Sequence, residues 1–123
     1  MDKIKVFVAD DSLVARNMLI RLLSKANDIE IAGEAGTAQS SIMLMKELSP
    51  DIILLEASIG GGMGISDLVK QFKSCKPDAK VILTVDASGI DAIADASGCG
   101  AFDFAQKPYN KANILRLIRE AAQ

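Results

Sequence analysis

The sequence predicts an α/β fold in which a parallel five-stranded sheet is covered by helices on both faces. Short apolar runs typical of buried strands alternate with segments whose apolar residues recur at helical spacing. The connections between these segments are short, which favours parallel strands joined by right-handed crossovers. The 123 residues contain no linker, low-complexity tract or internal repeat, so we expect residues 1–123 to form a single domain.

The predicted strands fall into a buried group and an exposed group. Nearly unbroken aliphatic runs indicate strands that are covered on both faces, and these runs are residues 4–9, 51–56 and 80–85. The more polar run 29–34 is expected near an edge of the sheet, and the short run 101–105 supplies the last strand.

Helices are predicted over residues 12–26, 37–48, 65–75 and 86–97, with a last helix that Asn110 caps. Ser12 and Thr37 are the corresponding caps of the first two helices. The segment 86–97 is rich in Ala, Ser, Asp and Gly, and we expect it to be the most mobile helix. The apolar residues expected to face the core are Leu13, Val14, Met18, Leu22 and Leu23, then Ile42, Met45 and Leu48 with Met43 and Leu44, then Leu68, Val69 and Phe72, and finally Ile114, Leu115, Leu117 and Ile118.

Composition limits the chemistry and the partners. A net charge of −2 without a basic stripe argues against nucleic-acid binding. No apolar run approaches the ~20 residues that cross a bilayer, so we expect a cytoplasmic protein that does not enter a membrane. The absence of His excludes Ser-His-Asp and His-ligated metal chemistry. Cys75 and Cys99 are expected to be free thiols.

Polar side chains follow the predicted strands at their carboxyl ends. Asp10 and Asp11 follow the first strand, Glu56 ends the third, Thr84 lies near the end of the fourth, and Lys107 follows the fifth. Parallel strands place these ends at one edge of the sheet. Clustered carboxylates repel, so Mg²⁺ and the lysine ammonium are their natural partners. The glycine-rich segment 60–64 lacks the Gly-Lys-Ser/Thr ending of a phosphate loop.

These residues, with Gly64 and the run Lys107-Pro108-Tyr109, resemble the receiver domain of two-component response regulators in its stand-alone, chemotaxis-regulator-like form. The resemblance covers essentially the whole chain. It implies a flavodoxin-like (βα)5 three-layer sandwich with strand order 2-1-3-4-5. It also implies a phosphoryl group taken from a histidine kinase or phosphotransfer protein onto position 56. Mg²⁺ would be held by Asp10, Asp11 and the backbone carbonyl of Ser58.

The resemblance also assigns switching roles. Thr84 would be the hydroxyl that moves toward the phosphoryl oxygens, and Lys107 would pair with their charge. Phe104 stands where the family has a switching aromatic ring, but it has no hydroxyl. A separate target protein would bind the face formed by the fourth helix, the last strand and the last helix, and we expect a monomer. The residues on that face are Ile90, Ala94, Phe104, Tyr109 and Lys111.

Two departures from the family pattern bear on activity. The acceptor position holds Glu56 in place of Asp, which moves the carboxylate by ~1.5 Å. Errors of about 1 Å can cost on the order of a hundredfold in rate, so we expect a poor acceptor whose longer reach extends toward Lys107 and Thr84. Two alternatives follow. Either Glu56 blocks phosphorylation and acts as a constitutive, active-like substitute for the phosphoryl charge, or some phosphoryl transfer survives. The glycine-rich loop after Ser58 is expected to be loose and therefore to weaken Mg²⁺ binding. Glu56 is a further candidate ligand for the ion.

Two other functions are compatible with an alternating sheet. A Mg²⁺-dependent phosphoryl-transfer enzyme would need a nucleophilic Asp at position 56 and a substrate cap. A flavodoxin-like electron carrier would need a hydroxyl-rich phosphate loop and aromatic rings around a flavin. Here Asp10 and Asp11 would repel a phosphate, and the chain has one Tyr and no Trp.

Overall fold

A computed structural model describes residues 2–59, 63–86 and 100–123, and it contains one sheet with the strand order β2-β1-β3-β4-β5. All four strand pairings are parallel. The strands are β1 (Ile4–Ala9), β2 (Ile29–Ala35), β3 (Ile52–Glu56), β4 (Lys80–Val85) and β5 (Asp103–Gln106). The helices are α1 (Leu13–Ser24), α2 (Ala38–Leu48), α3 (Ile65–Cys75) and α5 (Lys111–Ala121). The predicted fold class and strand order are therefore confirmed.

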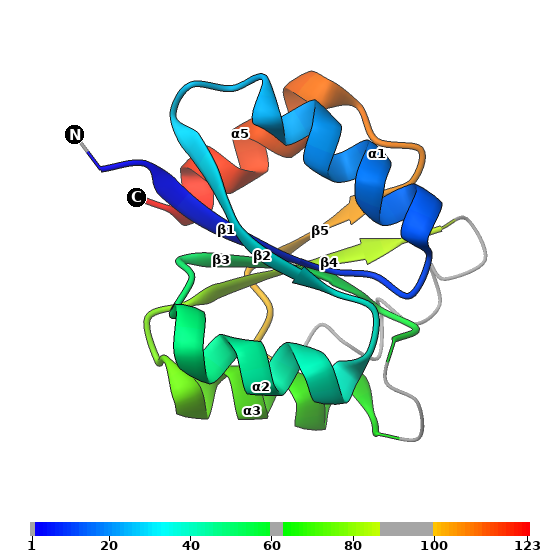
Figure 1. Ribbon diagram of the computed structural model, residues 1–123, viewed down its shortest axis with the longest axis vertical. Helices are drawn as coiled ribbons and strands as arrows, with labels where there is room; N and C mark the ends of the chain where they lie inside the picture. The colour runs from blue at the N-terminus through cyan, green and yellow to red at the C-terminus, as the bar shows by residue number, and fades with distance from the viewer. Residues whose placement is uncertain (1, 60–62, 87–99) are drawn as a thin grey trace.

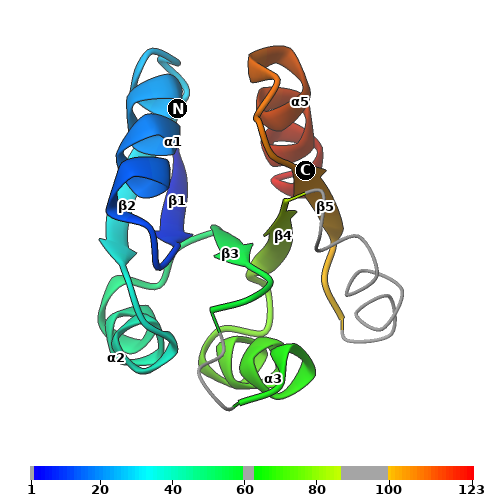
Figure 2. The same cartoon turned by 90° about the vertical axis from the view of Figure 1, so that its right-hand side faces the viewer.

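The helices lie in two layers, with α1 and α5 on one face of the sheet and α2 and α3 on the other (Figure 1 and Figure 2). Each layer encloses its own cluster of buried apolar side chains, because successive strand residues point to opposite faces. Phe7 and Phe72 lie in the cluster under α2 and α3, whereas Leu19 and Ile118 lie in the cluster under α1 and α5. No helix in the described ranges is long and apolar enough to span a bilayer.

Three predicted caps begin their helices. The side chains of Ser12, Thr37 and Asn110 each accept a hydrogen bond from a backbone N–H in the first turn, at 3.2, 3.0 and 3.0 Å. The expected helix 86–97 lies almost entirely outside the described residues, as does the glycine run 60–62.

The apolar residues at the start of α1 correct the sequence-based expectation. The side of α1 that packs on the sheet carries Leu19 and Leu23, which are four residues apart. The helix therefore turns an earlier apolar stripe to solvent, namely Leu13, Val14 and Met18, which are 60%, 70% and 65% exposed. In α2, Met45 is buried as expected, but Met43 is 66% exposed and does not broaden the core stripe.

Strand β5 begins later than the sequence suggested. The expected range was 101–105, whereas the ladder with β4 runs from the pair Ile82 and Asp103 to the pair Val85 and Gln106. The N–H of Phe102 still donates to the carbonyl of Val81 at 2.7 Å, so the chain meets the sheet one residue before the regular pairing starts.

Strand β2 forms one edge of the sheet, as its polar composition predicted, and its pairing with β1 is irregular. Val6 pairs with Ile31 and Phe7 with Gly33, so one residue of β2 is left without a partner. A Cβ atom on Gly33 would lie 2.6 Å from Cδ1 of Leu48, and this glycine therefore lets α2 pack closely on the edge strand.

Candidate acidic site at the carboxyl edge of the sheet

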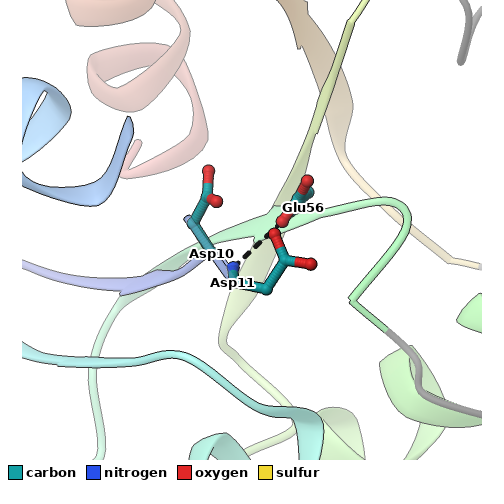
Figure 3. A group of neighbouring side chains, drawn as sticks. All are labelled: Asp10, Asp11 and Glu56. Carbon is teal, nitrogen blue, oxygen red and sulfur yellow. Dashed lines mark hydrogen bonds between the residues drawn. The ribbon is translucent and has the colours of Figure 1, made fainter. Parts of the chain in front are cut away.

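The ends of β1 and β3 bring three carboxylates together. One oxygen from each of Asp10, Asp11 and Glu56 lies within 4.8 Å of the others, as Figure 3 shows for the side chains. The side chain of Lys107, which follows β5, reaches the same group. The clustering expected from parallel strand ends is thus present, with the lysine on the same edge.

Three groups donate hydrogen bonds to Asp10. Its side chain is 2% exposed and accepts a 2.8 Å ion-paired hydrogen bond from Nζ of Lys107. Its other carboxylate oxygen accepts from the N–H of Ser12 at 2.8 Å, and its backbone carbonyl accepts from Nη1 of Arg16 at 2.6 Å. Nε of Arg16 also pairs with Glu34 on β2 at 2.9 Å. Nothing in the sequence pattern points to Arg16, although this side chain connects the acidic loop to the edge strand.

Glu56 is bound by neighbours on both sides of its carboxylate. Oε2 accepts from the backbone N–H of Asp11 at 3.0 Å, and Oε1 accepts from the hydroxyl of Ser58 at 3.0 Å. Nζ of Lys107 lies 3.8 Å from Oε1, farther than from Asp10. The expected reach of Glu56 toward Lys107 is therefore present, but the lysine pairs more closely with Asp10. The resemblance gives Ser58 a role only through its backbone carbonyl, so the contact of its hydroxyl with Glu56 was not expected.

The environment makes Glu56 a weak acid. Its pKa is raised from 4.5 to about 7, mainly by burial and also by the carboxyls of Asp11 and Asp10, which disfavour another negative charge. The N–H of Asp11 opposes this shift. For Lys107, burial favours the neutral amine, but the hydrogen bond and charge of Asp10 together with Tyr109 and Glu56 outweigh it, and the pKa of the ammonium is raised. At neutral pH the site therefore combines a charged lysine with a glutamic acid near half protonation.

Thr84 lies beside Glu56 in the sheet, because the two residues are paired across β3 and β4. Thr84 is only 1% exposed. Tyr109 is half-buried and its hydroxyl is enclosed, and its place on the partner face stays a prediction. Phe104 is 44% exposed and Lys111 is exposed. Ile90, Ala94 and Cys99 lie outside the described residues, whereas Cys75 is a free thiol.

The donor set fits a hard divalent cation. Carboxylate oxygens are the ligands that Mg²⁺ prefers, and Asp10, Asp11 and Glu56 each offer one to a common point. The ammonium of Lys107 already compensates part of this negative charge, since it lies 2.8 Å from Asp10 and 3.8 Å from Glu56.

Comparison with known proteins gives a consistent result. The model of the response regulator receiver domain family matches residues 6–119. The chain is 29% identical over 119 residues to chemotaxis protein CheY of Thermotoga maritima, covering 97% of this chain and 98% of that protein. It is 34% identical over 130 residues to a protein-glutamate methylesterase/protein-glutamine glutaminase of Clostridium acetobutylicum, covering 98% of this chain. The chain spans only 37% of that enzyme's length.

Solved structures share the fold. The response regulator domain of Thermotoga maritima CheB superposes with a TM-score of 0.84 and 24% identity, with 98% of this chain and 96% of that chain covered. The signal receiver domain of NarL from Mycobacterium tuberculosis gives a TM-score of 0.88 and 24% identity, with 99% and 98% covered. These matches lend no support to the alternative functions of phosphoryl-transfer enzyme and flavodoxin-like carrier. With the sheet order, the acidic edge and the family match over nearly its whole length, the chain belongs to the response regulator receiver domain family.

Proposed function

We propose that this receiver domain signals by binding other proteins and that Glu56 impairs its phosphorylation while supplying a permanent acidic group at the acceptor position. The observation that carries the proposal is the set of contacts made by the Glu56 carboxylate. It accepts from the N–H of Asp11 and the hydroxyl of Ser58, and it lies 3.8 Å from Nζ of Lys107. A phosphoryl group added at this position would compete for the same donors.

Two physical effects make Glu56 a poor nucleophile. Its added methylene displaces the reacting oxygen from the in-line position that a shorter Asp would take, and transfer rates are steeply sensitive to such displacement. Its pKa of about 7 means that much of the carboxyl carries a proton at neutral pH, and the protonated form does not attack phosphorus. The same proton reduces the negative charge with which Glu56 imitates a phosphoryl group.

A bound Mg²⁺ would be held by Asp10, Asp11 and the backbone carbonyl of Ser58, with Glu56 as a further ligand. When bound, the ion supplies positive charge against the phosphoryl oxygens. In the proposed arrangement, the ammonium of Lys107 compensates another part of the negative charge on the phosphoryl oxygens. The hydroxyl of Thr84 approaches one of these oxygens. The expected weakening of Mg²⁺ binding by the loop after Ser58 stays a prediction.

The test is phosphoryl incorporation from acetyl phosphate with Mg²⁺. In a productive reaction, an acceptor oxygen bonds to phosphorus while the bond from phosphorus to the acetate oxygen breaks, and acetate leaves. We expect stable label in the Glu56→Asp variant and none in the unmodified chain or in Glu56→Gln. Label in the unmodified chain at the level of Glu56→Asp would refute the impairment. Absence of label in every chain would count against a surviving receiver site.

The partners proposed for this domain are a histidine kinase or phosphotransfer protein and a separate target protein, and the proposed output is binding rather than catalysis. On the part of the target face that the structure describes, Phe104 is 44% exposed and Lys111 is exposed. In labelled Glu56→Asp protein, amide resonances of these two residues should move when acetyl phosphate and Mg²⁺ are added. Constant resonances there, with changes confined to the acidic site, would contradict this location of the output face.

A further inference from the structure

The hydroxyl of Tyr109 is the one buried side-chain polar atom in residues 2–59, 63–86 and 100–123 that has no hydrogen-bond partner. Its ring packs against the apolar cluster under α1 and α5, which explains why the ring is buried. A phenylalanine would pack there equally well without enclosing an unpaired donor. Since a buried unpaired hydroxyl lowers stability, this one requires a role that the proposed function has not yet used.

The surroundings of the phenol identify its neighbour. Burial raises the pKa of Tyr109, and the Thr84 side chain opposes this as a hydrogen-bonding neighbour. The charges of Lys107, Asp10 and Glu56 also act on the phenol. The hydroxyl is therefore enclosed near Thr84 and within range of the charges of the acidic site.

Thr84 occupies the middle of this arrangement. It is 1% exposed and is paired with Glu56 on β3 on one side and with Ala105 on β5 on the other. Its small side chain can rotate without moving the strand. Phe104, the neighbouring aromatic residue on β5, is 44% exposed and has no hydroxyl, so it offers Thr84 no polar partner.

We propose that Tyr109 is a positioning residue whose hydroxyl forms a hydrogen bond with the hydroxyl of Thr84 in the ligand-free protein, and that this bond is lost when Thr84 turns toward an oxyanion at position 56. The Tyr109 hydroxyl has no partner in the structure, so the proposed bond requires the Thr84 side chain to rotate toward it. Tyr109 directly precedes Asn110, the N-cap of α5, so the pair links the acidic site to the start of that helix. The loss of this bond when an oxyanion is present at position 56 rests on the proposed function. The hydrogen bond between Tyr109 and Thr84 in the ligand-free protein does not.

The contact can be tested in metal-free, unphosphorylated protein. Tyr109 is the single tyrosine of the chain, so tyrosine labelled with ¹³C at Cζ gives one resonance that reports on this phenol. Thr84→Val removes the hydroxyl and keeps the shape, whereas Thr84→Ser keeps a hydroxyl. Ser58→Ala is the matched control, because it removes a hydroxyl that donates to Glu56 instead.

We expect Thr84→Val to move the Cζ resonance, and Thr84→Ser and Ser58→Ala to leave it near its original position. A Thr84→Val spectrum that coincides with that of the unmodified chain would overturn the inference, as would an equal displacement in Thr84→Ser. If Thr84→Val does not fold, Tyr109→Phe provides the reciprocal measurement. The Thr84 methyl resonance must then move, and an unchanged resonance refutes the contact.

The switching part is tested separately in the Glu56→Asp variant. With acetyl phosphate and Mg²⁺, the Cζ resonance should move in the direction that Thr84→Val produces, and Thr84→Val in the same background should abolish the movement. Failure to label the variant would count against the proposed function and leave the ligand-free result intact. Labelling without movement of the resonance would overturn the switching role of Tyr109.

Discussion

Replacing Glu56 by Gln should remove a pH dependence of stability that the unmodified chain shows between about pH 5 and pH 8. Burial and the neighbouring carboxyls of Asp11 and Asp10 together raise the pKa of this carboxyl from 4.5 to about 7. The folded protein therefore holds the proton more tightly than the unfolded chain. The stability that this proton contributes is fully present below 4.5 and is lost as the pH rises through about 7.

The size of the effect follows from the shift. Each pKa unit corresponds to about 1.4 kcal/mol, so a change from 4.5 to about 7 sets an upper limit of about 3.5 kcal/mol. The Glu56 side chain is 15% exposed, and water that reaches the carboxylate screens its interactions. We therefore expect a loss of about 1–2 kcal/mol in the free energy of unfolding across this range.

Urea unfolding at about pH 5, 6, 7 and 8 measures the effect directly. The chain has no His, which is the side chain that ordinarily titrates in this range. The unmodified chain should lose stability with rising pH, whereas Glu56→Gln should give a nearly flat profile. Glu30→Gln, which removes an exposed carboxylate on β2, should retain the slope of the unmodified chain. Parallel profiles for Glu56→Gln and the unmodified chain, or stability that rises with pH, would refute the reasoning.

Three further substitutions test how the site and its scaffold are held. Lys107→Met leaves the 2%-exposed carboxylate of Asp10 without its 2.8 Å partner and should lower the free energy of unfolding at pH 7 by about 2–4 kcal/mol, and a double variant with Asp10→Asn that is no more stable than Lys107→Met alone would contradict this cause. Gly33→Ala should cost about 1–3 kcal/mol in urea unfolding because the new Cβ would lie 2.6 Å from Leu48, and additional Leu48→Ala should recover part of the loss. Thr37→Ala should lower stability by about 1 kcal/mol through loss of the α2 cap, whereas Thr37→Ser should be close to neutral by the same assay.

Much of the fold could be predicted because buried strands and helices have recognisable patterns of apolar residues. The aliphatic runs of β1, β3 and β4 and the polar run of β2 fixed which strands are central and which is at an edge. Helix α1 shows the limit of this reasoning. Its sequence contains two apolar stripes that both satisfy helical spacing, and only packing against the sheet determines that Leu19 and Leu23 face inward while Val14 faces solvent.

The candidate site could likewise be predicted only in part. Asp10, Asp11, Glu56 and Lys107 could be placed together because parallel strands end at one edge of the sheet. Which carboxylate the lysine prefers could not be predicted, since it depends on side-chain reach at the sub-ångström level. The contacts of Arg16 with the Asp10 carbonyl and of the Ser58 hydroxyl with Glu56 depend on local rotamers and loop geometry. A buried phenol at Tyr109 likewise has no signature in sequence spacing.

The irregular pairing of β2 affects how molecules of this protein meet one another. An edge strand with a regular row of free backbone groups is a template on which a second chain can add its own strand. The unpaired residue between Ile31 and Gly33 breaks the regular spacing, and Glu30 places an exposed negative charge on the same strand. Two molecules brought together at this edge would therefore meet mismatched donors and repelling carboxylates, which protects the protein against self-association into extended sheets at high concentration.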